Sequence, residues 1–259
     1  MVSDRKWFFI PAFILVLSFS AISPAAVIIR GKSVGRVIQL FGKNHMEQSE
    51  FTTYLENNRM RQDTKSKGKD QSVIIRSDLK VMYVVDHRAH TYTQLTESDV
   101  KAFRRQMEDL RRDPKNAQMM DAMMNWAAQL VKVDRYEAHG SDTAMGKSCT
   151  NYYGYRGNQK VMEVCVLPNG IFSTARKASQ VSKGAASFLS EMVPAGMMQK
   201  QVDVLIESSA VHLGFPVKVT RYFGKHVSGS TEISQLSDEW FTPSSVFDVP
   251  AGYKLMRRS

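Results

Sequence analysis

The chain has 259 residues, of which 43% are hydrophobic, a formal net charge of +10 and two cysteines. This length suffices for one domain with a real hydrophobic core, and no segment after the N-terminal region is apolar enough to span a membrane. The positive charge favours anionic partners such as lipid headgroups or lipopolysaccharide phosphates, but we prefer the simpler interpretation of a solvated basic surface that keeps the protein soluble.

The N-terminal region has the three-part pattern of a secretory signal peptide. Arg5 and Lys6 precede an apolar run over residues 7–22, and small residues follow. We expect cleavage so that the mature chain starts at Ala26 or Val27, and we take residues 1–26 as the predicted signal peptide. An uncleaved anchor is the alternative, because apolar residues continue to Ile29. We therefore expect a periplasmic or secreted protein with no nucleic-acid partner.

The first part of the mature chain alternates between apolar and polar residues in short runs separated by polar turns. This pattern predicts a meander of antiparallel hairpins. The expected strands cover residues 34–41, 49–56, 58–64, 72–76, 80–85 and 90–95.

The turn after residue 85 contains Asp86, His87 and His90. These residues have two interpretations: a metal or acid-base site, or the polar tip of a hairpin. A metal site needs further ligands, and the other histidines are scattered singly along the chain. Because turn chemistry alone explains Asp86, we favour the hairpin tip and expect neither metal nor cofactor.

Residues from about 97 to 132 predict a helical insertion. Thr96 and Asp99 form a capping-box pattern, and Asp113 with Pro114 restarts the helix. The second helix carries a methionine-rich face, for which core packing, an apolar ligand surface and Cu(I) binding by thioethers are the alternatives. The candidate ligand-binding residues on this face are Met120, Met123, Met124, Ala127 and Val131.

The two cysteines, Cys149 and Cys165, flank a predicted β-hairpin. With Arg156, Gly157 and Asn158 as a three-residue loop, the cysteines face each other directly across the strands, within the range that a disulfide spans. Their spacing is not that of a redox-active Cys-x-x-Cys pair, so we expect a structural disulfide.

The rest of the chain predicts a helical stretch at about 174–192 and further strands at 202–208, 217–223, 231–237 and 245–249. No repeat or linker divides the chain, which predicts a single domain over 27–259. The expected fold class is α+β: a strongly curved antiparallel sheet or incomplete β-barrel, with helices packed on its concave side. No nucleophile elbow, zinc-binding helix or EF-hand loop is present, so we predict no enzyme and no catalytic residues.

Three stretches resemble a family of exported bacterial proteins, itself without an assigned function, that is similar to the LolA/LolB lipoprotein-carrier superfamily. The matching residues are Arg59, Met60, Arg61, Asp78, Lys80, Met82, Tyr83, Asp86, Thr91, Tyr92, Ser245, Phe247, Val249, Pro250, Gly252 and Tyr253. The resemblance implies a LolA-like half-open barrel whose apolar cavity holds acyl chains, with residues 97–132 as a lid.

Two functions therefore remain open. The first is a non-enzymatic periplasmic binding or carrier protein for an apolar or lipid moiety, with a lipid, an acylated protein or an anionic envelope surface as partner. The alternative is a structural or protein-interaction module of the cell envelope, with a filled core and no ligand.

Overall fold

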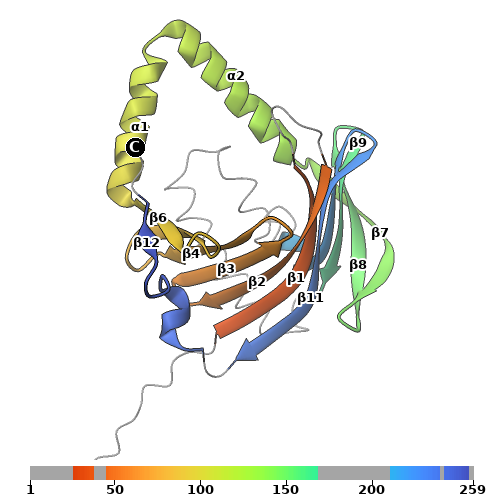
Figure 1. The fold of residues 1–259 in the computed structure, drawn as a ribbon. Helices are drawn as coiled ribbons and strands as arrows, with labels where there is room; N and C mark the ends of the chain where they lie inside the picture. Colours follow the sequence, from red (N-terminus) through yellow and green to blue (C-terminus); the bar gives the residue numbers. More distant parts are fainter. Residues whose placement is uncertain (1–25, 38–44, 169–210, 240–241, 257–259) are drawn as a thin grey trace, which may run out of the picture.

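The structure, a computed structural model, describes residues 26–37, 45–168, 211–239 and 242–256 (Figure 1). The predicted signal peptide before residue 26, the helical stretch 174–192 and the strand 202–208 lie outside these residues, so those expectations stay predictions.

The described residues form one twelve-stranded sheet that does not close into a barrel, in the order β12-β6-β5-β4-β3-β2-β1-β11-β10-β9-β8-β7. All neighbours are antiparallel except β12, which runs parallel to β6. Figure 1 shows the sheet curving strongly around a concave side. The strands are β1 (Ala26–Val37), β2 (His45–Glu56), β3 (Arg59–Ser66), β4 (Asp70–Arg76), β5 (Val81–Asp86), β6 (Thr91–Thr96), β7 (Arg135–Ala144), β8 (Lys147–Arg156), β9 (Gln159–Leu167), β10 (Phe215–Phe223), β11 (His226–Glu239) and β12 (Lys254–Leu255). The predicted antiparallel, curved and open sheet is thus confirmed.

The concave side of β1 to β5 carries the core because alternate residues of each strand point to it. Leu55 lies directly opposite both Val27 and Met60, and Ile75 lies opposite Met60 and Met82. All five side chains are at most 3% exposed and belong to one apolar cluster that continues to the cysteines of β8 and β9.

The first strand differs from its prediction. It begins at Ala26, whereas the sequence pattern predicts a start at residue 34. Val27 and Ile29 belong to the core cluster. Gly31 continues this face beneath the ring of Phe51, which lies 2.5 Å from the position a Cβ would take.

Helices α1 (Glu97–Arg111) and α2 (Pro114–Val131) begin where predicted. Thr96 and Asp99 form the capping box, and the Asp113 side chain caps α2 by accepting from the backbone N–H of Lys115. No helix among the described residues has both the length and the apolarity needed to cross a membrane.

The arrangement of α1 and α2 departs from the predicted packing of helices on the concave side. They rise from the β6 end of the sheet as an arch that descends toward β7 (Figure 1). Val100 is the one buried residue of α1, and Leu110 is 45% exposed. The basic residues of α1 leave too little apolar surface to bury a whole helical face.

The cysteine hairpin is confirmed, although its register is not. Cys149 and Cys165 form a disulfide with a Cα–Cα distance of 5.6 Å. The turn has two residues, since Arg156 pairs with Gln159, and a bulge follows. Cys165 therefore lies opposite Asn151, and the disulfide joins diagonal neighbours instead of directly opposed ones.

Strand β7 was not predicted. It forms one end of the described sheet and pairs only with β8. The pairing is interrupted by a bulge between Ala138 and Ser141, where Gly140 has a φ of 79°. Most of its residues are exposed, which removes the apolar alternation that marks a strand in sequence.

Residues 242–256, which we call the C-terminal strap, lie across the convex side of the sheet. The predicted strand at 245–249 is wrong: the 3-10 helix η2 (Ser244–Phe247) occupies this stretch and contacts β3 and β4. The Phe247 side chain is 0% exposed, and the Arg59 guanidinium lies 4.9 Å from its ring centroid. The strap then continues to β12 beside β6.

Arg76 ties the strap to the sheet. Its guanidinium donates to Asp248 of the strap at 2.9 Å and to Asp78 at 2.8 Å. The hydrogen bond from Arg76 is the main cause that lowers the pKa of Asp78 below its ordinary value.

Replacement of Asp78 by asparagine tests this ion pair through pH. Because the folded-state pKa of Asp78 is lowered, its contribution to stability is present above about pH 4 and is lost as the pH falls further. The Asp78 side chain is 37% exposed, so we expect Asp78→Asn to cost less than about 1 kcal/mol at neutral pH. Urea unfolding across a pH series should show the difference from wild type shrinking in acid.

The matched control is Asp109→Asn, which removes a carboxylate that is 64% exposed and 3.3 Å from Arg112. A loss of stability as large as that of Asp78→Asn, or a difference that grows in acid, would contradict this assignment.

Candidate functional site

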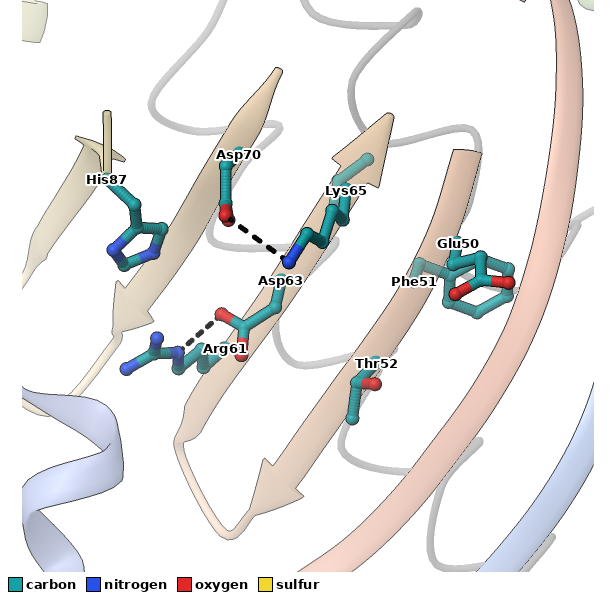
Figure 2. A pocket seen from close by; sticks show the side chains of 9 residues that line it. Glu50, Phe51, Thr52, Arg61, Asp63, Lys65, Asp70 and His87 are labelled. Carbon is teal, nitrogen blue, oxygen red and sulfur yellow. Dashed lines mark hydrogen bonds and ion pairs between the residues drawn. The ribbon is translucent and has the colours of Figure 1, made fainter. Parts of the chain in front are cut away.

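A polar groove opens on the convex side of the sheet, with a volume of about 360 Å³. Figure 2 shows charged side chains from neighbouring strands pointing into it, with ion pairs between Arg61 and Asp63 and between Lys65 and Asp70. The residues that line the groove are Glu50, Phe51, Thr52, Arg61, Asp63, Thr64, Lys65, Asp70 and His87.

A chain of hydrogen bonds beneath the groove fixes its wall. The Ser72 hydroxyl donates to Asp63 at 2.5 Å and lies 2.6 Å from Nε2 of His87, whose Nδ1 lies 3.0 Å from the Tyr253 hydroxyl. Ser72 therefore links Asp63 to His87, and the Tyr253 hydroxyl of the strap lies at the other nitrogen of the same ring.

Arg61 completes this arrangement. It donates to Asp63 at 2.6 Å, to Ser72 at 3.1 Å and to the carbonyl of Val246 in the strap at 3.0 Å. The groove wall and the strap therefore share one set of hydrogen bonds, which holds the Arg61–Asp63 pair in a single orientation.

This geometry is suited to recognition. Ser72 is 0% exposed, so its hydroxyl is not accessible to a substrate. Both nitrogens of His87 lie within hydrogen-bond distance of protein groups, Nε2 of the buried Ser72 hydroxyl and Nδ1 of the Tyr253 hydroxyl. The accessible groups on the convex side of the groove are carboxylates, Lys65 and the Thr52 hydroxyl, which are able to form hydrogen bonds and ion pairs with a polar partner.

The turn at residues 86–90 follows the hairpin-tip interpretation only in part. Asp86 accepts from the backbone N–H groups of Arg88 and Ala89, both at 3.0 Å, as a turn residue does. His87 departs from the prediction, because its side chain belongs to the groove. The ring of His90 meets the edge of Tyr253 instead. No group of three metal-ligating side chains was found among the described residues.

A row of alternating charges crosses the convex side and passes through the groove. Each member lies directly opposite the next on the adjacent strand. Measured ion-pair distances are 3.7 Å for Lys218–Glu232, 3.6 Å for Lys32–Glu50 and 3.8 Å for Lys65–Asp70. This charge ladder consists of Lys218, Glu232, Lys32, Glu50, Lys65 and Asp70 on β10, β11, β1, β2, β3 and β4.

Reversal of one charge tests the ladder. Glu50→Lys would place three lysines in a row with Lys32 and Lys65, and like charges directly opposite each other destabilise a sheet. We expect a loss of about 0.5–1 kcal/mol in the free energy of unfolding at low ionic strength, and less at high salt. Urea unfolding at two salt concentrations measures both effects.

Glu137→Lys is the matched control, since Glu137 lies on the end strand β7 and outside the ladder. An equal, salt-sensitive loss in this variant would show that net charge, and not the ladder, determines the effect.

Of the predicted lid residues, the structure describes the side chain of Met120 alone. Met120 of α2 is 8% exposed, whereas its neighbour Met119 is 66% exposed. The side chains of Met123, Met124, Ala127 and Val131 lie outside the described residues, so their role as a ligand-binding face stays a prediction.

Sequence reasoning missed the groove. A partial signal was present, because Thr52 and Ser72 alternate with apolar residues along β2 and β4, whereas β3 is polar at most positions on both faces. In the sequence alone, such positions look the same as the solvent face of any sheet. These side chains meet only because of the register between neighbouring strands, and the sequence of a single strand does not determine that register.

The fold and the groove together define a class: a large, open antiparallel sheet with a buried apolar side and a charged groove on the other. No protein-family profile matches the chain, and no curated protein matches it in sequence.

Several solved structures are similar at low identity. An uncharacterized conserved protein from Thermus thermophilus is 9% identical, with 89% of this chain and 90% of that chain covered and a TM-score of 0.44. MucB in complex with MucA(peri) is 10% identical over 90% of this chain and 57% of that chain, with a TM-score of 0.37. The match to the MucA/MucB complex of Pseudomonas aeruginosa is 13% identical over 87% of this chain and 56% of that chain, with a TM-score of 0.37.

The chain thus spans less than two thirds of the MucB chains that it matches. Matches with such low identities and TM-scores establish neither a family nor a function. The resemblance to the LolA/LolB-like superfamily continues to rest on the sequence motifs.

Proposed function

We propose that the protein is a non-enzymatic binding module of the bacterial cell envelope that engages a polypeptide partner through its convex groove. One observation carries this proposal: the apolar concave side is buried, whereas the charged groove is open. Leu55, Met60 and Ile75 at the centre of the concave side are each 1% exposed. Large apolar ligands require accessible apolar surface, which these residues do not offer.

The chemistry of the groove fits a polypeptide. A peptide segment presents backbone donors and acceptors together with side chains of both charges. The groove presents positive and negative side chains next to each other, as in the neighbouring Lys65 and Asp70. The Lys65–Asp70 distance of 3.8 Å is long for an ion pair, so both groups can exchange this contact for one with a partner. The fixed Arg61–Asp63 pair would orient the bound segment.

The envelope location rests on the predicted signal peptide. The disulfide between Cys149 and Cys165 agrees with it, because disulfides form and persist in oxidising compartments.

Site-specific photocrosslinking in intact cells tests this function. A photoreactive residue in place of Thr52, in the groove, should give one discrete protein adduct. The same residue in place of Thr143, on the end strand β7, is the control and should give none. Adding Asp70→Lys to the Thr52 variant should abolish the adduct. Equal adducts from both positions, or an adduct that survives Asp70→Lys, would contradict binding in the groove.

A second function, the carrier of an apolar or lipid moiety, is favoured by a different observation. The buried apolar cluster runs without interruption from Met82 of β5 to Cys149 of β8, the continuous apolar lining that a carrier needs. Native mass spectrometry of the purified protein, followed by lipid extraction, distinguishes the two. A co-purified lipid, or saturable binding of a fluorescent fatty acid, would support the carrier.

A further inference from the structure

Two neighbouring hairpin turns form a rigid basic edge beside the groove. The turns are β3–β4, at residues 66–69, and β5–β6, at residues 87–90. The backbone N–H of His87 donates to the carbonyl of Asp70 at 2.9 Å, and the Arg88 guanidinium donates to the carbonyl of Lys67 at 3.0 Å. These two bonds join the two turns and hold their backbones side by side.

The cations of this edge outnumber the acids. We define the basic edge as Lys65, Lys67, Lys69, Arg88 and Lys254. Lys254 joins it because its backbone N–H donates to the carbonyl of His90 at 3.0 Å. Three acidic neighbours are Asp70, paired with Lys65, Asp86, which caps its own turn, and Glu47, which accepts from the Ser66 hydroxyl at 2.6 Å.

Four of these cations are available to a partner. Lys67, Lys69, Arg88 and Lys254 are all exposed, and none of them forms an ion pair within the part of the chain that the structure describes. Most arginines of the convex side, such as Arg61 and Arg76, are by contrast held by carboxylates.

Exposed apolar side chains lie next to these cations. Leu255 is 47% exposed and Met256 is 53% exposed, directly after Lys254. Their backbone is fixed to the sheet, since the N–H of Met256 donates to the carbonyl of Tyr92 at 2.8 Å. Exposed cations beside exposed apolar residues are the composition of surfaces that lie on a lipid headgroup layer.

We propose that the basic edge docks the protein on a membrane surface that bears acidic phospholipid headgroups. The exposed cations lie on two joined turns and on the adjoining strand β12, so an extended anionic surface can contact them together, whereas only Lys65 among them lines the groove. The groove itself contains more acids than bases and does not favour a free anion. Docking by this edge goes beyond the proposed function and does not depend on it.

Vesicle co-sedimentation of the full mature protein tests the proposal. Wild type should bind vesicles that contain phosphatidylglycerol, fail to bind vesicles of phosphatidylcholine alone, and be released by salt. A triple variant, Lys67→Gln with Lys69→Gln and Arg88→Gln, should bind roughly a hundredfold more weakly, since each cation contributes about fivefold.

The matched control removes three other exposed cations, Arg105→Gln with Lys115→Gln and Lys225→Gln, and has the same net charge. It should bind within about twofold of wild type. Equal losses in the two triple variants would show a nonspecific charge effect, and binding of a soluble polyanion without binding of vesicles would show a different partner. Either result overturns the proposal. The photocrosslink at Thr52 tests the polypeptide-binding function and is independent of vesicle binding.

Discussion

A Phe247→Ala variant is expected to lose about 3–5 kcal/mol in its free energy of unfolding. Phe247 is completely buried between the strap and the convex side of β3 and β4, and Arg59 lies over its ring. Truncation to alanine removes the buried ring and leaves a cavity that the surrounding sheet cannot refill. Urea unfolding followed by circular dichroism measures the loss.

The same variant should release the strap from the sheet. Hydrogen exchange of residues 242–256 is expected to rise more than that of β3 and β4, because η2 has no other buried residue. Phe247→Leu is the conservative control and should keep most of the stability. A full loss in both variants, or unchanged exchange of the strap after Phe247→Ala, would contradict a role as the anchor of this segment.

Removal of the disulfide, by Cys149→Ala with Cys165→Ala, is expected to cost about 3 kcal/mol. The bond closes a loop with a sequence separation of 16, and it restricts the unfolded chain more than it changes the folded one. The two cysteines are 1% and 2% exposed and belong to the core cluster. Thermal unfolding of the double variant gives the measurement.

Burial of the sulfurs makes a second outcome testable on wild-type protein. A thiol reductant should leave the disulfide intact under native conditions and reduce it once denaturant is added, because the attacking thiolate must reach a sulfur. Rapid reduction of the native protein, or an unchanged unfolding temperature in the double variant, would contradict a structural role for this bond.

Local signals in the sequence predicted most of the elements. The strands β2 to β6 follow from apolar alternation, and the starts of α1 and α2 follow from Thr96 and Asp113, because caps act within one helical turn. The errors fall where the local sequence pattern is weak or fits two different structures. Strand β7 is exposed along most of its length, and the run at Val27 and Ile29 reads equally well as the tail of a leader.

The register of the cysteine hairpin shows why pairing is harder to predict than the elements themselves. Both a three-residue and a two-residue turn fit Arg156, Gly157 and Asn158, and the bulge after Gly154 adds a further shift. Either register leaves the cysteines close enough to bond, so the disulfide was predictable although the pairing was not.

The groove depended on contacts between distant segments. Arg61 and Ser72 lie on neighbouring strands, but Tyr253 and Val246 come from the strap, more than a hundred residues later in the chain. No spacing in the sequence marks His87 as the partner of Ser72, since that pairing requires the register of β3, β4 and β5 together with the path of the strap.

The bulge in β7 has a consequence for how molecules of this protein meet one another. An open sheet offers its last strand as a template on which a strand of another molecule can add, and repetition of that step builds fibrils. At Gly140 the run of outward N–H and C=O groups is broken, so an incoming strand finds no long uninterrupted stretch. Within the described sheet, the bulge therefore limits the addition of a further strand at the β7 end.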